Sequence, residues 1–159
     1  MTTEQLTMMV ATPAGLDPRE LAWAAGLFEG EGTIRINKAT GRNRGGVLHC
    51  SVVNTDRSVV EFFQDRWPGY CKAVRPVPGH KQAWVWTVAA RKAERFIRDL
   101  LPYLFTERMW TKAQWGLTYQ DTKQVGRRRL RAEEVDDYLA LQEHFYSVMC
   151  DLNRRGIAV

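Results

Sequence analysis

The segment LAWAAGLFEGEGTI, residues 21–34, constrains the fold more than any other part of this chain. It combines small residues with two carboxylates, and a glycine follows each of them. Asp17 and Glu20 form a capping box, and Pro18 suits the first helical position, so we predict a helix from about Pro18 to about Glu29. One face of this helix carries almost no side-chain bulk. That face comprises Ala22, Ala25, Gly26 and Glu29. Another helix backbone can therefore approach it closely.

Two glycines end the predicted helix and leave a carboxylate at its tip. Gly30 and Gly32 flank Glu31, and β-branched residues follow at once. The C-terminus of a helix is the negative end of its dipole, so an anion is unfavourable there unless a cation binds. Within the helix, Gly26 costs roughly 1 kcal/mol relative to alanine. This cost indicates that the fold requires a residue without a side chain at this position.

The segment resembles the signature of the LAGLIDADG family of homing endonucleases. Residues 25–32 fall on the last eight positions of that signature, and Ala24 replaces its leading leucine. In this family two copies of the motif helix pack through their small residues, and the last acidic residue of each copy holds a divalent metal beside a scissile phosphate. The resemblance therefore implies that Glu31 and the Gly30 carbonyl bind Mg²⁺ or another divalent cation. Glutamate keeps the oxygen ligands that Mg²⁺ requires. The alternative interpretation of this segment is an ordinary amphipathic helix that ends at a glycine.

The order of the predicted elements extends the resemblance over most of the chain. We predict strands at 33–37, 47–53, 70–77 and 82–89, and helices between Asp56 and Pro68 and over 91–101. Helices at 110–121 and 132–155 follow, with a basic connector at 125–131. The order αββαββα is the core of the α+β LAGLIDADG fold, which implies a four-stranded antiparallel DNA-binding sheet with extra C-terminal helices. Trp84 and Trp86 are expected in the core of this fold.

Length and charge suggest a single domain with a polyanionic partner. A chain of 159 residues suffices for one domain, which we expect over 17–159 after a loosely ordered terminus at 1–16. The net charge is +5, and no acid occurs between Glu31 and Asp56 or between Asp65 and Glu94. Both acid-free stretches coincide with predicted strands, so double-stranded DNA is the expected partner.

The three cysteines and the polarity of the chain indicate its setting. The cysteines are widely spaced and show no CxxC pattern, so they suggest neither a disulfide framework nor a zinc site. No apolar run reaches membrane-spanning length, and no secretory signal is recognised. We therefore expect a soluble intracellular protein that is not secreted and has neither a membrane partner nor a small-molecule substrate. Splicing blocks typical of inteins are not recognised, which favours a freestanding or intron-encoded origin.

The presence of one motif helix implies a homodimer, because cutting both strands requires an acidic site for each phosphate. A two-fold axis through the small-residue face would pair two Glu31 residues and favour a long, pseudo-palindromic target. The resemblance implies further catalytic groups. Asn54 is expected to hold the attacking water, and Arg57 to steady a phosphate. Glu107 stands where the family usually has lysine, so Arg108 or Lys112 is expected to supply the cation.

Base reading is expected from strand residues that alternate into the major groove. In the first strand pair the candidates are Arg35, Asn37, Arg42, Arg44, His49 and Ser51; in the second they are Lys72, Arg75, Lys81 and Thr87. Phosphate contacts or solvated strand faces are equally open for each residue. At the level of the whole protein, an intron maturase, a non-cleaving DNA-binding regulator and a basic oligomerisation protein remain alternatives to an endonuclease.

Overall fold

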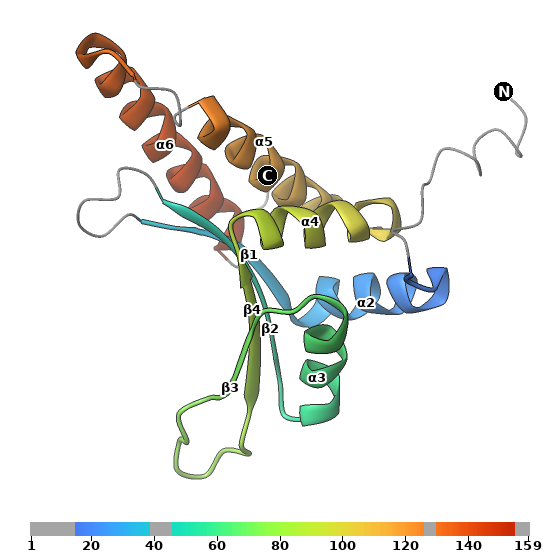
Figure 1. The fold of residues 1–159 in the computed structure, drawn as a ribbon. Coiled ribbons are helices and arrows are strands. Elements are labelled where there is room, and N and C mark those ends of the chain that lie inside the picture. Colours follow the sequence, from blue (N-terminus) through green and yellow to red (C-terminus); the bar gives the residue numbers. More distant parts are fainter. Residues whose placement is uncertain (1–14, 39–45, 126–129, 155–159) are drawn as a thin grey trace, which may run out of the picture.

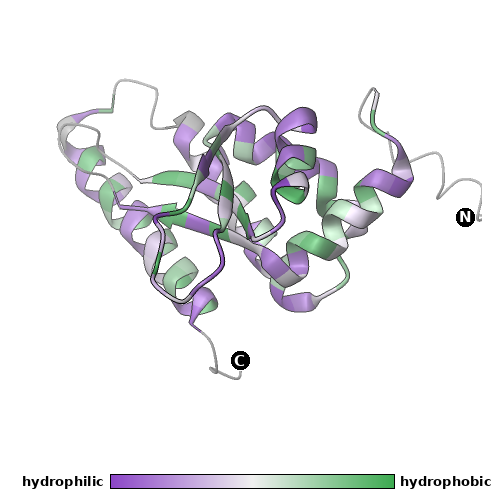
Figure 2. Ribbon diagram, turned by 90° about the horizontal axis from the view of Figure 1, so that it is seen from below, coloured by the Kyte–Doolittle hydropathy of each residue, from purple (hydrophilic) through white to green (hydrophobic). Residues whose placement is uncertain are grey.

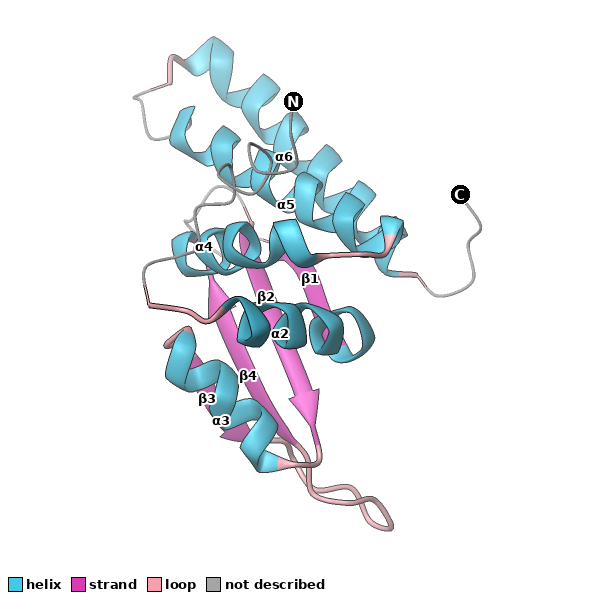
Figure 3. Ribbon diagram, turned by 90° about the vertical axis from the view of Figure 1, so that its right-hand side faces the viewer, coloured by secondary structure: helices cyan, strands magenta, loops and turns pink. Residues whose placement is uncertain are grey.

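A four-stranded antiparallel sheet with helices on one face forms the centre of the molecule. The computed structural model describes residues 15–38, 46–125 and 130–154. The strands run in the order β1-β2-β4-β3, with β1 at Gly32–Asn37, β2 at Val47–Asn54, β3 at Tyr70–Ala73 and β4 at Trp84–Ala89. Helices α2 (Pro18–Glu31), α3 (Arg57–Arg66) and α4 (Arg91–Leu100) cover one face of this sheet (Figures 1 and 3). The predicted αββαββα order is confirmed.

The two C-terminal helices extend the fold beside β1. A 3₁₀ turn at Leu101–Tyr103 leads into α5 (Glu107–Val125), which is followed by α6 (Ala132–Asn153). Both helices contact β1 and each other. Among the described residues, no helix has the length and apolarity that crossing a membrane requires. Hydrophobic and hydrophilic residues alternate along the helices (Figure 2), as expected for elements with one buried face.

Helix α2 begins as its sequence predicts and ends two residues later than predicted. The Asp17 carboxylate accepts a hydrogen bond from the Arg19 amide at 2.8 Å, and Pro18 occupies the first turn. At the other end the chain passes straight into β1. A Cβ atom on Gly32 would lie 2.1 Å from Cδ2 of Phe28, so the change from helix to strand requires glycine.

The core lies between the sheet and its three covering helices and is largely aromatic. Trp86 of β4 is fully buried, with its ring centroid 4.9 Å from that of Phe96 and 5.1 Å from that of Phe63. Its indole nitrogen donates to the Trp67 carbonyl at 3.0 Å. The core position expected for Trp86 is thus confirmed, whereas Trp84 is only partly buried.

The second strand pair is shorter than predicted. We expected strands over 70–77 and 82–89, but pairing ends at Ala73 and Trp84 apart from one bond from the Val74 amide to the Ala83 carbonyl, 2.8 Å long. Pro76 and Pro78 cannot donate to a ladder, so the chain leaves the sheet before them. The predicted termini at 1–14 and 155–159, the loop at 39–45 and the connector at 126–129 lie outside the described residues.

Candidate active site

The strand register determines which side chains share the open face of the sheet. Ile34, Leu48, Cys50, Val52 and Trp86 point into the core, so their neighbours along each strand point to the opposite face. Cross-strand pairs such as Thr33 with Ser51 and Ser51 with Thr87 are aligned on that face. Six of the residues predicted to read DNA share it: Arg35, Asn37, His49, Ser51, Lys72 and Thr87.

The other four predicted DNA contacts are placed differently. Arg75 and Lys81 lie in the exposed loop between β3 and β4 rather than in strands, because that strand pair is short. Arg42 and Arg44 lie outside the described residues. The open face also carries Tyr70, which is 63% exposed and lies opposite Thr87; its exposure could not be read from a sequence in which neighbouring aromatic residues are core.

His49 on this face favours its neutral form. Burial and the positive charge of the facing Arg35 both lower the pKa of the imidazole. Its Nδ1 atom is buried and has no hydrogen-bond partner among the described residues. A neutral imidazole has one donor and one acceptor nitrogen, and because Nδ1 is buried only the other nitrogen could face a ligand placed on the sheet.

The small-residue face of α2 differs from the predicted one. Ala25 is fully buried, because it points towards the sheet together with Leu21 and Phe28. Its assignment to the dimer face is therefore wrong. The exposed stripe is formed by Ala22, Gly26 and Gly30, which are four residues apart. A Cβ atom added at either glycine would meet no atom within 4 Å, so the stripe can accept a closely packed partner.

Glu29, which was predicted to lie on the dimer face, holds the beginning of α5. Its Oε1 atom accepts hydrogen bonds from the Phe105 amide at 2.7 Å, the Thr106 amide at 2.6 Å and the Thr106 hydroxyl at 2.9 Å. These donors precede α5, whose first amides have no partner within the helix. The carboxylate thus acts as a cap supplied from another helix and places the first turns of α5 beside the end of α2.

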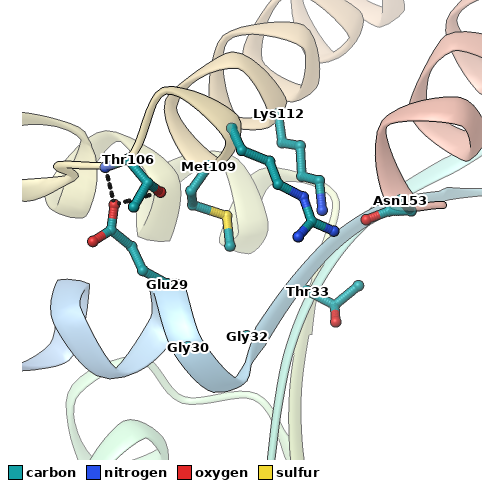
Figure 4. Close-up of a pocket in the computed structure, with 9 residues that line it drawn as sticks. Glu29, Gly30, Gly32, Thr33, Thr106, Met109, Lys112 and Asn153 are labelled. Carbon is teal, nitrogen blue, oxygen red and sulfur yellow. Dashed lines mark hydrogen bonds between the residues drawn. The ribbon is translucent and has the colours of Figure 1, made fainter. Parts of the chain in front are cut away.

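A pocket of about 190 Å³ lies where these elements meet (Figure 4). It is bounded by the end of α2, the start of β1, the first turns of α5 and the last residue of α6. Its lining residues are Glu29, Gly30, Gly32, Thr33, Thr106, Arg108, Met109, Lys112 and Asn153. Two cationic side chains and several hydrogen-bonding groups therefore converge on one small volume.

Lys112 is the most perturbed titratable group in the pocket. Its side chain is carried by α5 towards the pocket (Figure 4), and only 4% of the residue is exposed. Desolvation, and secondarily the charge of Arg108, lowers the pKa of Lys112 from 10.5 to about 8. Within the described part of the chain it forms neither a hydrogen bond nor an ion pair. An amine with this pKa can exchange a proton near neutral pH.

Glu31 lies at the exposed tip of α2, beside the pocket rather than in its wall. No described residue forms a hydrogen bond or ion pair with its carboxylate. No cluster of three His, Cys, Asp or Glu residues occurs among the described residues. One carboxylate with nearby carbonyl groups fits Mg²⁺ only where water and substrate phosphates supply the other ligands. This donor set therefore matches a site that substrate completes.

Comparison with solved structures identifies the architecture. No family model and no curated protein matches this sequence. The homing endonuclease I-CvuI, in complex with its target in the presence of Ca, superposes with a TM-score of 0.67 at 15% identity over 89% of this chain and 87% of that one. The group I intron-encoded homing endonuclease I-CeuI, complexed with DNA, gives a TM-score of 0.68 at 13% identity over 92% of this chain and 72% of that one. The LAGLIDADG homing endonuclease I-GzeII, in complex with a DNA target, gives a TM-score of 0.62 at 12% identity over 87% of this chain and 46% of that one. The chain has the LAGLIDADG homing-endonuclease fold.

Within this LAGLIDADG fold, two predicted catalytic residues form contacts outside the pocket. The Asn54 side-chain oxygen accepts from the Asp56 amide at 2.8 Å in the turn that leads into α3. Arg57 bonds Glu61 at 2.7 Å and lies over the Trp84 ring, 4.8 Å from its centroid. Neither residue lines the pocket. Both have structural partners that the motif comparison could not reveal.

The structure brings Arg108 and Lys112 together at the end of α2, and Asn153 lies in the same pocket. Arg108 and Lys112 are one turn apart on α5 and line the same pocket. Asn153 comes from the far end of the chain, where its sequence indicates only a helix terminus. Nothing in the local sequence could have assigned it to the pocket.

Proposed function

We propose that this protein is a site-specific homing endonuclease that hydrolyses both strands of a pseudo-palindromic DNA site as a homodimer, using Mg²⁺ or another divalent cation. The observation that carries the proposal is the pocket at the end of the motif helix. There a buried lysine of lowered pKa and an arginine lie beside the segment Gly30–Gly32, which presents Glu31. Cations for a phosphate and an anion for a metal are thus adjacent.

DNA would bind along the open face of the sheet. That face carries Arg35, Lys72 and the neutral His49, and the loop beyond β3 adds Arg75 and Lys81. Arginine can read guanine through two hydrogen bonds, and asparagine such as Asn37 can read adenine. The net charge of +5 supplies the long-range attraction to phosphates.

A second copy would pack on the exposed stripe of α2. Ala22, Gly26 and Gly30 leave room for a backbone to approach, and a two-fold contact through them would bring the two Glu31 residues near each other. Such symmetry provides one acidic site for each DNA strand and requires a target whose halves are related.

The side chains of the pocket suit hydrolysis of a phosphodiester. Glu31 and the Gly30 carbonyl would hold the cation, which polarises the scissile phosphate and stabilises the leaving oxygen. Arg108 would bind a non-bridging phosphate oxygen. The neutral amine of Lys112 would accept a proton from water while the water oxygen bonds to phosphorus. The bond to the leaving sugar oxygen then breaks, and that oxygen takes up a proton from solvent water, while Lys112 later returns its proton to solvent.

One observation favours a second candidate, a maturase or a regulator that binds without cutting. Glu107, at the position where the resemblance predicts lysine, is exposed and begins α5. If Lys112 does not replace that lysine, binding would persist without hydrolysis.

The test is cleavage of a randomised duplex library, and of DNA flanking the gene, with and without Mg²⁺. Wild type is compared with Glu31→Gln, which removes the anionic ligand at almost constant volume, and with Glu133→Gln, the same change at an exposed site in the first turn of α6. Metal-dependent cutting that only Glu31→Gln abolishes supports the endonuclease. Specific binding without cutting assigns the protein to the second candidate, and the absence of specific binding contradicts both.

A further inference from the structure

We infer that Asn153, the last residue of α6, positions the attacking water in the pocket, opposite Lys112. The inference rests on the proposed function and deepens it, because it makes the C-terminal helix part of the active site. It also transfers to Asn153 the role that the sequence predicted for Asn54.

The amide of Asn153 is held in one orientation by the sheet. Its Nδ2 atom donates to the main-chain carbonyl of Ile34 in β1 at 2.8 Å, across 119 residues of sequence. Ile34 is only three residues beyond Glu31, so this bond fixes the end of α6 next to the metal-binding segment. With Nδ2 bound to the strand, the Oδ1 atom remains as a free acceptor, and Figure 4 shows the amide facing the side of the pocket that holds Lys112.

Two of the polar groups that line the pocket are engaged with each other. The Oε1 atom of Glu29 already accepts three hydrogen bonds, and the Thr106 hydroxyl donates one of them. Lys112 itself forms no hydrogen bond within the described part of the chain, although a buried amine needs partners. A volume of about 190 Å³ accommodates several waters, since each occupies about 30 Å³ in the liquid.

A water held between these two side chains would have the orientation that hydrolysis requires. It would donate one hydrogen to Asn153 Oδ1 and its other hydrogen to the neutral Lys112 amine, which leaves its lone pairs free to face phosphorus. A neutral amide is suited to this task. A carboxylate in the same place would pair with the lysine and keep it protonated, so it could no longer accept the proton of the water.

Asn54 is less suited to the same role. Its side-chain oxygen is engaged by the Asp56 amide, and Asp56 in turn caps α3 through the Ser58 amide at 2.9 Å. The turn into α3 therefore draws on the same oxygen that would accept a hydrogen bond from the water. Asn153, by contrast, has a donor fixed by the strand and an acceptor left over.

The experiment compares three variants of the full chain in two assays. Asn153→Leu removes the amide, Asn153→Asp keeps an oxygen acceptor but adds charge, and Arg154→Ala perturbs the same helix end without entering the pocket. The first assay measures the rate of a single turnover, started by adding Mg²⁺ to complexes formed with the selected duplex in Ca²⁺. The second measures the pKa of Lys112 in the DNA-free protein by NMR of ¹³C-labelled lysine.

The expected results separate positioning from a structural role. Asn153→Leu should slow cutting by about 100-fold or more while its DNA affinity in Ca²⁺ stays within about three-fold of wild type, and Arg154→Ala should behave as wild type. Asn153→Asp should raise the pKa of Lys112 by about one unit or more, and its cutting rate should recover as pH rises. The facing charges of Arg108, Glu29 and Glu31 are the same in all three variants.

Each contrary result overturns the inference in a distinguishable way. Equal cutting by wild type and Asn153→Leu refutes the role of Asn153 and leaves the endonuclease intact. An unchanged pKa of Lys112 in Asn153→Asp shows that the two side chains do not face each other, even if Asn153→Leu fails to fold. If wild type binds its duplex without cutting it, the proposed activity fails, and the NMR result alone then decides whether the two side chains are coupled.

Discussion

Replacing Lys112 by methionine should stabilise the folded protein while abolishing its activity. The lysine is almost wholly buried, and desolvation is the main cause of its lowered pKa. A fall from 10.5 to about 8 corresponds to about 3 kcal/mol at roughly 1.36 kcal/mol per pKa unit. This is the cost of keeping the ammonium charged in the fold. Methionine fills a similar volume without a charge, so the free energy of unfolding at pH 7 should rise by about 2–3 kcal/mol.

The dependence on pH distinguishes this cost from a simple packing gain. Below pH 8 lysine is protonated in both the folded and the unfolded state, so the advantage of methionine is constant. Between pH 8 and 10.5 the folded state loses the proton while the unfolded state still holds it. Wild type therefore gains stability as pH rises, and the difference between the proteins narrows. Urea unfolding followed by tryptophan fluorescence at pH 7, 8.5 and 10 measures that difference.

Lys92→Met provides the matched control. Lys92 is exposed on α4, and the same substitution there should change stability by no more than about 0.5 kcal/mol at any of the three pH values. If Lys112→Met is less stable than wild type at pH 7, or if its advantage does not shrink with rising pH, the buried ammonium is not the source of the effect and the reasoning is refuted.

Four further substitutions test individual features of the site. Glu31→Gln should reduce cutting by roughly 100-fold or more without weakening DNA binding in Ca²⁺, as measured by titration of labelled duplex. Gly26→Leu should leave the circular dichroism of the fold unchanged, because the space beside Gly26 is open, but should yield monomers in sedimentation equilibrium. Glu29→Ala should lower stability to urea by about 1–2 kcal/mol, since it removes the cap of α5. Gly32→Ala should lower it by about 1–3 kcal/mol, because the new methyl group would collide with the Phe28 ring. A wild-type cutting rate for Glu31→Gln, a wild-type mass for Gly26→Leu, or wild-type stability for Glu29→Ala or Gly32→Ala would contradict the corresponding assignment.

Local signals in the sequence predicted the elements that carry the site. Asp17 caps α2 as its capping box indicates, and Asp56 does the same for α3. The alternation expected along β1 and β2 places Arg35 and His49 on one face, opposite the buried Ile34 and Cys50. These predictions succeed because caps and strand alternation depend on neighbours within a few residues.

Predictions failed where a residue had a choice of partners. Ala25 was assigned to the wrong face because several small residues of α2 were compatible with either face, and only packing against the sheet decides between them. The hydrogen bond from the Asp56 amide to the Asn54 side chain was not expected either, although the two residues are only two positions apart. Asn153 was missed because its bond to Ile34 spans 119 residues, and no local pattern encodes such a contact.

Three features near the end of α2 are unfavourable in the isolated subunit, and the proposed function would offset each of them with a different partner. Glu31 places an anion at the negative end of a helix dipole without a described counter-ion, which a divalent cation would supply. Gly26 and Gly30 weaken an exposed helix surface, which a second motif helix would cover. The charge of Arg108 lies beside Lys112 and contributes to lowering its pKa, and a phosphate bound by Arg108 would compensate that charge. Because a metal, a second subunit and a phosphate would all bind within one short segment, the three costs have a common explanation in a dimeric site that is completed on DNA.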